Sequence, residues 1–522
     1  MDQLQGLTWP DVAYLVPEIT LILMAIVITL IDLALPRTTN RSFTGWLSLA
    51  GILGSMGFVV WQLLDMNPLA GGEGTAVVSL LGDSYRVDGF ALIMKLVLLG
   101  ASALIVLMSI QAVDQDDAIT DKGETYTILL PALTGAMILC STADLITMFV
   151  GLELLSISTY VLVGMRKRSV QSAEGAFKYV VVGGISTAFI LFGMSYLYGA
   201  TGSTNLGLIG SLLPQALINF EALIYIGFFF LIGGLAVKIA AAPFHAWAPD
   251  VYQGAAPPIA AFLAVISKAA ALIALFRFIY NTAIFQTKLT PGHQVHAIGG
   301  DVLLALKVLA AAAMIVGTTA ALRQRNTKRL LALSGVANAG YLLVPIAVGM
   351  TYLHTNTVGE FTYYLIAYAL MNIGVFAVLS VVSRAAGHDE LRGYAGLYYR
   401  APWTAAAMIL LLLSLAGLPI TGGFFGKLFI LLSAAQSGDY WLAAIMIATS
   451  VISYYFYFAI IRQMFMRVSE TDASLRMPIT AGLTLWICTV LTFALGVAPS
   501  WVMGWIERAV TLSADLFIGI SG

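Results

Sequence analysis

Charged residues are scarce in this chain: Asp, Glu, Lys and Arg make up only 10% of its 522 residues, against about 25% in typical soluble proteins. This scarcity excludes a soluble protein of this length, and the net charge of -1 argues against a nucleic-acid partner. Cysteine is nearly absent as well. Cys140 and Cys488 lie far apart in apolar runs, without the spacing of zinc or iron–sulfur ligands. The N-terminal stretch MDQLQGLTWPDVAYLVPE lacks the basic segment and cleavage site of a removable signal peptide, so none is expected.

Hydrophobic residues, by contrast, make up 60% of the sequence. They gather into runs of about 20 or more, and each run is long enough to cross a roughly 30 Å hydrocarbon layer as a helix. Barrel strands would instead show short alternating segments. We therefore expect an all-α polytopic membrane protein with about fourteen transmembrane helices. The expected spans are 12–35, 43–64, 89–111, 126–142, 144–165, 174–198, 222–242, 255–280, 300–321, 329–350, 360–384, 403–436, 440–466 and 479–505.

Basic residues are distributed unevenly between the expected loops. Of the 26 Lys and Arg, 16 fall in odd-numbered loops or the adjoining span ends, and 4 fall in even-numbered loops, their adjoining span ends or the C-terminal tail. The positive-inside rule then places the odd loops in the cytoplasm and both termini on the non-cytoplasmic side of the cell membrane. The other six are lysines within apolar spans: Lys95, Lys178, Lys238, Lys268, Lys307 and Lys427.

Charge inside a membrane points to function. An ionised residue at the bilayer centre costs roughly 2.5–3.5 kcal/mol on insertion scales and usually marks an ion or proton path. Glu153 lies near the middle of its span, and Lys268 follows Pro258 by ten residues, about 15 Å along a helix. Both are therefore functional candidates. Lys95 and Lys307 lie closer to span ends, where a lysine can reach the interface, so a structural or interface-reaching role is expected for them, and Lys95→Met is expected to have a mild effect.

Two of the lysines stand beside residues that interrupt helices. Lys238 lies in LIGGLAVKIAAAPFHAWAPD, and Lys427 lies in LAGLPITGGFFGKLFILL. Broken backbone at membrane depth is tolerated only where it is buried in protein or lines a wet cavity. These are the seventh and twelfth spans, five apart, and paired broken helices in inverted repeats usually mark a transport site. We expect both helices to be broken beside their lysines.

Two further residues have open interpretations. Lys178 follows Glu174 by four residues, so a surface ion pair competes with a functional role. His245, beside Pro243 and Trp247 at the end of the seventh span, is either a gate or a packing residue.

The segment VKIAAAPFHAWAPDVYQGAAPPIAAFLAVISKAAAL resembles the signature of the antiporter-like membrane subunits of respiratory complex I, and within them the subunit N (chain 2) family. Further similar segments, among them NTKRLLALSGVANAGYLLVP and SLAGLPITGGFFGKLFILLSA, extend the resemblance over roughly residues 124–435. It implies two inverted five-helix repeats with broken helices 7 and 12. The expected units are residues 1–123 (helices 1–3), 124–298 (repeat one, helices 4–8), 299–476 (repeat two, helices 9–13) and 477–522 (helix 14 and tail).

By motif match, the proton-path residues of this family fall on Glu153, Lys178, Lys238, Lys268 and Lys427. Relatives often carry a histidine at the position of Asn338 in SGVANAGY. Asparagine carries no proton at physiological pH, so water or Ser334 is expected to substitute.

The resemblance implies a proton-translocating subunit of NADH–quinone oxidoreductase with no cofactor of its own. NADH, FMN, iron–sulfur clusters and quinone are then expected in partner subunits. The implied partners are subunit M, small hydrophobic subunits of complex I and the lipid bilayer, but no nucleic acid.

The mechanistic hypothesis is that Glu153 holds Lys238 protonated, with Lys178 as a second partner. Loosening this ion pair would send the proton toward Lys268 and then Lys427. An ion pair in a partly dry interior contributes on the order of several kcal/mol. Moving one charge against 150 mV takes about 3.5 kcal/mol, which is comparable.

Three alternatives stay open at this point. The chain could belong to a multi-subunit sodium–proton antiporter, for which sodium-dependent translocation would be evidence. It could be a ferredoxin- and plastoquinone-type photosynthetic relative of complex I. It could also be a scaffold that only anchors a redox complex, in which case replacing the buried lysines would be neutral.

The distribution of basic residues predicts the sidedness of the termini. Reporters that are active on only one side of the membrane, fused to either end, should both report the non-cytoplasmic side. The same reporter inserted at residues 166–168 should report the cytoplasm. A cytoplasmic signal from either terminus would mean that the helix count is wrong.

Overall fold

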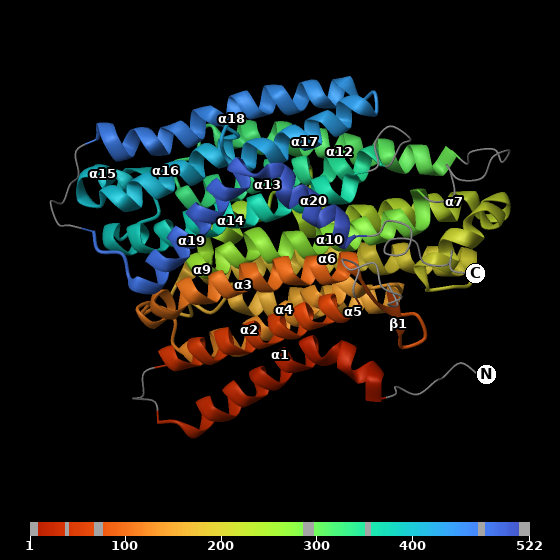
Figure 1. Ribbon diagram of the computed structural model, residues 1–522, viewed down its shortest axis with the longest axis horizontal. Helices are drawn as coiled ribbons and strands as arrows, with labels where there is room; N and C mark the ends of the chain where they lie inside the picture. Colours follow the sequence, from red (N-terminus) through yellow and green to blue (C-terminus); the bar gives the residue numbers. More distant parts are fainter. Residues whose placement is uncertain are drawn as a thin grey trace.

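The computed structural model describes residues 9–36, 41–66, 77–284, 297–349, 356–467 and 475–510. Its helices lie roughly side by side along the long axis of the molecule (Figure 1). Within the described residues, 13 helices are long and apolar enough to cross a membrane. They are α1 (Trp9–Ala34), α2 (Ser42–Asp65), α3 (Gly89–Asp114), α4 (Lys122–Ser141), α5 (Leu145–Val163), α6 (Val170–Thr201), α7 (Leu206–Ile239), the continuous α9 (Pro257–Phe262), η1 (Leu263–Ser267) and α10 (Lys268–Ile279), α12 (Ala297–Ala321), α13 (Thr327–Val348), α14 (Thr357–Ala386), α18 (Tyr440–Met466) and α19 (Ile479–Val497).

A fourteenth crossing is made by two short helices, α16 (Pro402–Ala416) and α17 (Gly422–Gln436), of 15 residues each. A 15-residue helix is about 22 Å long, too short to cross the membrane alone. The two follow one another along the long axis (Figure 1). Together they form the expected twelfth span, broken in the middle, so the prediction of about fourteen transmembrane helices is confirmed.

The seventh span differs from the expected 222–242. Helix α7 begins at Leu206, where the Asn205 side chain accepts a hydrogen bond from the Leu208 N–H and caps the helix (3.1 Å). It bends at Phe220, whose backbone is not helical (φ -130°, ψ 29°). After it ends at Ile239, the short helix α8 (Ala248–Gly254) follows. The apolar run before residue 222 was wrongly assigned to a loop.

Some smaller elements were also not expected. A hairpin of β1 (Val77–Leu80) and β2 (Tyr85–Asp88) precedes α3, with Val78 paired to Val87. The expected span 479–505 is divided at Pro499, where α20 (Pro499–Ala509) begins. The remaining elements are η2 (Tyr280–Ile284), η3 (Leu391–Tyr394) and α15 (Leu397–Arg400).

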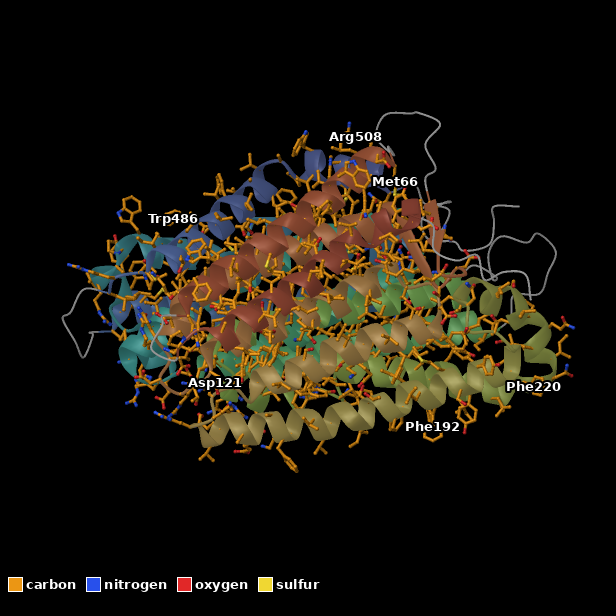
Figure 2. All side chains as sticks on the ribbon, turned by 90° about the horizontal axis from the view of Figure 1, so that it is seen from below. Met66, Asp121, Phe192, Phe220, Trp486 and Arg508 are labelled. Atoms are coloured by element: carbon orange, nitrogen blue, oxygen red, sulfur yellow. The ribbon has the colours of Figure 1, made fainter. Side chains whose placement is uncertain are left out.

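Four of the odd-numbered loops meet at one end of the bundle. A polar pocket of about 540 Å³ is lined there by Asp116, Arg166, Lys328, Arg384 and Asp389, which come from four of these loops or the adjoining helix ends. Asp121, from an odd loop, lies toward the end of the bundle opposite Phe220 (Figure 2). The structure thus brings these four odd-numbered loops to one end, while their sidedness stays a prediction.

Lys95 is fully buried in an ion pair, which agrees with the expected structural role, but the expectation that it reaches the interface is wrong, and with it the reason to expect a mild effect of Lys95→Met. Its Nζ lies 2.8 Å from Glu18 Oε1 on α1 and donates a hydrogen bond to the Tyr85 hydroxyl (2.8 Å). Tyr85 in turn donates to Glu18 (2.6 Å). The hairpin and α1 enclose the start of α3, so this ion pair ties the N-terminal helices together.

A second buried ion pair joins the hairpin to helix α10. Arg277, near the end of the expected span 255–280, is fully buried, and its Nη2 lies 2.6 Å from Asp88 Oδ1. Arg277 Nε also donates to the Cys140 carbonyl at the end of α4 (2.6 Å). Asp88 caps α3 by accepting from the Ala91 N–H (2.7 Å). Arg277 therefore connects three segments that are distant in the sequence.

Replacing Lys95 should destabilise the subunit. Lys95→Met leaves the Glu18 carboxylate buried without its counter-charge, at a cost of about 3–5 kcal/mol. The measurement is the thermal stability of the purified complex together with the amount of this chain incorporated. The double variant Glu18→Gln/Lys95→Met should recover part of the loss, because no unpaired charge remains.

Lys167→Met serves as the matched control, because Lys167 forms an exposed pair with Asp121 and should change stability little. Equal stability of the wild type and Lys95→Met would contradict a structural role for this pair.

Candidate functional site

The predicted relay residues occupy different environments. Lys238, Lys268 and Lys427 are buried, at 8%, 2% and 8% exposure. Glu153 is partly buried with 21% of its side chain exposed, whereas Lys178 has 40% exposed. Three lysines thus lie within the bundle, and Lys178 lies near its surface.

Glu153 and Lys238 face each other across α5 and α7. Lys238 Nζ lies 3.5 Å from Glu153 Oε1, so the predicted ion pair is present but long. The shorter bond of the amine is to Ser156 Oγ (2.6 Å), and the Tyr160 hydroxyl lies 3.4 Å away. Thr187 donates to the same Glu153 oxygen (2.7 Å). The carboxylate is therefore held by a hydroxyl while it faces the amine loosely.

The first helix break follows Lys238 directly. Helix α7 ends at Ile239, Ala240 takes a left-handed conformation (φ +60°), and the Ala242–Pro243 bond is cis. Trp247 Nε1 donates to the Val237 carbonyl (3.1 Å), which also accepts from the Ala240 N–H at the helix end (3.0 Å). The prediction of a break beside Lys238 is confirmed.

The glycines before Lys238 serve another purpose than the break. Gly233 and Gly234 are helical, and a Cβ on Gly234 would stand 2.8 Å from the Ser186 carbonyl of α6. Ser186 Oγ also donates to the Gly234 carbonyl (2.8 Å). These contacts show that Gly234 permits close packing of α6 on α7.

The second break lies between Ala416 and Gly422, before Lys427. Gly417 and Ile420 both have positive φ (+85° and +72°). Gly423 is required by close approach, because a Cβ there would stand 2.0 Å from the Ser414 carbonyl. The predicted break of the twelfth span is confirmed.

Lys427 bonds to the end of the helix before its break. Its Nζ donates to the carbonyls of Leu415 (2.9 Å) and Ala416 (3.3 Å), the last residues of α16. A helix C-terminus presents unpaired carbonyls and a partial negative charge, both of which favour an ammonium group. Lys427 thus follows its break, whereas Lys238 precedes its own.

Lys268 lies at the junction of η1 and α10. The η1 segment is π-helical, a rare conformation that often occurs at functional sites, and no sequence pattern had indicated it. Lys268 Nζ is buried and forms no hydrogen bond with the described residues. It lies 5.8 Å from the centre of the Tyr252 ring and against Gly335 of α13.

Lys178 pairs with other residues than the hypothesis required. Its Nζ lies 2.6 Å from Glu174 and 2.6 Å from Asp250 of α8. The surface pair with Glu174 that the sequence suggested is present. Among the described residues, the charged partners of Lys178 are Glu174 and Asp250, so its expected role as a second partner of the Glu153–Lys238 pair is not supported. Arg329 also pairs with Asp250. Burial acts to raise the pKa of Asp250, but hydrogen bonds from Lys178 and Arg329 outweigh it and lower this pKa.

Aromatic residues fill the space between Lys238 and Lys268. Tyr160 and Tyr179 pack edge to face with ring centres 4.7 Å apart, and Tyr179 stacks on Trp247 at 4.7 Å. The Tyr179 hydroxyl interacts with Ser267, the residue before Lys268. Sequence reasoning missed these tyrosines, because in an apolar span they look like packing residues.

His245 and Ser334, the two supporting candidates, lie in different places. His245 is half-buried in the connection between α7 and α8, and its carbonyl accepts from the Ala248 N–H (3.0 Å). This helix-start position fits packing, and a gate role stays a prediction. Ser334 is fully buried on α13 and hydrogen-bonds to the Tyr457 hydroxyl. Among the described residues, no group of three His, Cys, Asp or Glu could hold a metal ion.

The sequence matches the profile of the NADH:quinone oxidoreductase/Mrp antiporter transmembrane family over residues 142–453. It is 57% identical to NADH-quinone oxidoreductase subunit N of Paenibacillus sp. (strain JDR-2), over 99% of this chain and 100% of that protein. It is 44% identical to subunit N of Brevibacillus brevis, over 97% and 96%. A chain in the structure of respiratory complex I from Thermus thermophilus with bound Aureothin is similar with a TM-score of 0.74 and 30% identity. That similarity covers 94% of this chain and 99% of the other.

Proposed function

The chain belongs to the NADH:quinone oxidoreductase/Mrp antiporter family of membrane subunits, and we propose that it translocates protons as a subunit N-type component of an NADH–quinone oxidoreductase. Full-length similarity to proteins named as subunit N supports this assignment over a sodium–proton antiporter subunit. The proton is carried along Glu153, Lys238, Lys268 and Lys427.

The observation that carries the relay proposal is the loosely held pair at the first helix break. Lys238 Nζ is 3.5 Å from Glu153 and 2.6 Å from Ser156, and Lys238 is the residue before the last of helix α7. A hydroxyl can stabilise the amine whether it is charged or neutral, because it both accepts and donates. The pair can therefore loosen while the amine keeps a hydrogen-bond partner.

Lys178 takes a different part in the proposed path. Together with Asp250 and Arg329 it forms a partly exposed charged cluster beside α8. Asp250 belongs to the WAPDVYQG segment, which also carries Tyr252 next to Lys268. We place Lys178 at the supply side of the path, exchanging protons with water, rather than beside Glu153.

The redox chemistry is assigned to partner subunits. The sequence holds no nucleotide-binding fingerprint and no cluster-ligand spacing, so NADH, FMN, iron–sulfur clusters and quinone are proposed to lie in other subunits. The partners are proposed to be antiporter-like subunit M and small hydrophobic subunits in the cell membrane. Both termini are proposed to face away from the cytoplasm.

Removing the charge of the pair tests the relay. Glu153→Gln keeps size and hydrogen bonding but loses the carboxylate charge, and Lys238→Met removes the amine. Each should lower proton pumping, and the coupled quinone reduction, by about 10- to 100-fold, since a positioned proton-transfer group contributes at least this much. The measurement is quinone reduction together with vesicle acidification by the assembled complex.

Glu221→Gln is the matched control, because Glu221 is exposed near the kink of α7. It should pump normally. Assembly must be checked for each variant, since a buried charge without its partner can unfold the chain. Normal pumping by a fully assembled Glu153→Gln complex would refute the role of this carboxylate.

A further inference from the structure

Helix α13 spans the distance between Lys268 and Lys427. At one point along it, a Cβ on Gly335 would stand 2.6 Å from Lys268 Nζ and 3.2 Å from the Tyr368 hydroxyl. About two turns further, the Tyr341 ring centre lies 4.8 Å from Lys427 Nζ. Side chains of this part of α13 therefore lie between the two lysines.

Ser334 and Asn338 of this part of α13 form a hydrogen-bonded cluster with Tyr364 and Tyr457, which we call the hydroxyl network. Ser334 Oγ bonds to the Tyr457 hydroxyl. Asn338 Nδ2 donates to Ser334 Oγ (3.3 Å), and the Tyr364 hydroxyl donates to Asn338 Oδ1 (2.6 Å). All four side chains are at most 2% exposed. The network joins α13, α14 and α18.

Tyr341 lies between the network and Lys427, in contact with both through its ring. The Tyr341 and Tyr364 rings pack edge to face, with centres 6.3 Å apart. The Tyr341 hydroxyl bonds to Thr449 Oγ1 (2.9 Å) and Ser450 Oγ (3.0 Å) on α18. A buried hydroxyl must find a hydrogen-bond partner, whereas an apolar side chain can fill the same space without one. Packing alone therefore does not account for so many buried hydroxyls.

Hydroxyl groups and the amide of Asn338 differ in what they can do with a proton. A hydroxyl can accept a proton on oxygen while it releases its own hydrogen to the next acceptor, so charge moves without a lasting ion. A carboxamide cannot carry a proton at neutral pH. Asn338, bonded on both its nitrogen and its oxygen, instead fixes the directions of Ser334 and Tyr364.

We propose that the hydroxyls of Ser334 and Tyr457, oriented by Asn338 and Tyr364, conduct the proton between Lys268 and Lys427. This inference rests on the proposed function and identifies the connection between two of its stations. Lys268 gives up one N–H proton and becomes a neutral amine. Each hydroxyl accepts one proton and passes one on, bridging water completes the longer steps, and the neutral Lys427 amine takes up the last proton. The hydroxyls then rotate back, with no net change in the network.

The test uses Phe replacements, which remove one oxygen and keep the ring. Tyr457→Phe and Tyr364→Phe should each lower the coupled rate of pumping and quinone reduction about threefold to tenfold. This is less than the loss of a complete proton-transfer group, because water can replace one hydroxyl. The solvent deuterium isotope effect on turnover should rise in both variants, as proton transfer becomes more rate-limiting.

Tyr363→Phe is the matched control. Tyr363 is the neighbour of Tyr364 on α14 and is fully buried, but its hydroxyl donates to the Leu495 carbonyl on α19, away from the network (2.7 Å). It loses one buried hydrogen bond of the same type. Its turnover and isotope effect should match those of the wild type in the assembled complex.

A rescue variant separates proton conduction from a structural role. Asn338→His places a group that can carry a proton at the centre of the network. The double variant Asn338→His/Tyr457→Phe should recover turnover and a wild-type isotope effect relative to Tyr457→Phe. If Tyr457→Phe and Tyr364→Phe both behave like Tyr363→Phe, the proposal is overturned. Glu153→Gln, tested in parallel, decides the proposed function independently, since it lies outside the network.

Discussion

A buried amine or guanidinium needs hydrogen-bond acceptors, because an ion that leaves water without them costs several kcal/mol. Much of this bundle is arranged around that requirement. Lys95 and Arg277 are met by the carboxylates of Glu18 and Asp88 at 2.8 and 2.6 Å. Lys427 is met by carbonyls that are free because α16 ends there. The second break therefore creates the acceptors for its lysine, and Gly423 allows the following helix to begin close enough to use them.

The buried ion pairs divide into tight and loose ones. Glu18–Lys95 and Asp88–Arg277 are short, almost completely buried and bonded to further groups, so they hold segments together. Glu153–Lys238 is longer, at 3.5 Å, and each partner has a closer hydroxyl bond, from Thr187 and to Ser156. A pair of this kind can separate at lower cost, because both groups keep a partner. The loose Glu153–Lys238 pair therefore suits a switch, whereas the two tight pairs stabilise the fold.

The three buried relay lysines also differ in what surrounds each amine. Lys238 has a carboxylate and hydroxyls, and Lys427 has carbonyls, which can only accept and so favour the ammonium form. Lys268 has no hydrogen bond with the described residues, only the Tyr252 ring at 5.8 Å. Its charged form is the least supported of the three. This difference fits a residue that holds the proton only briefly, between Lys238 and Lys427, whose amines have more hydrogen-bond partners.

The sequence by itself determined the number of spans and the two interrupted helices, and it singled out Lys238, Lys268 and Lys427, which are buried in the bundle, because length, helix-breaking residues and the cost of buried charge act within single helices. It did not determine what each charge meets. Lys95 looked free to reach the interface, and Lys178 looked like a partner of Glu153, yet Glu18 and Asp250 pair with them. The π-helical turn before Lys268 and the tyrosines around Asn338 were invisible for the same reason. Their roles depend on the distances between helices that lie far apart in the sequence, as Ser334 and Tyr457 do, and only tertiary packing sets those distances.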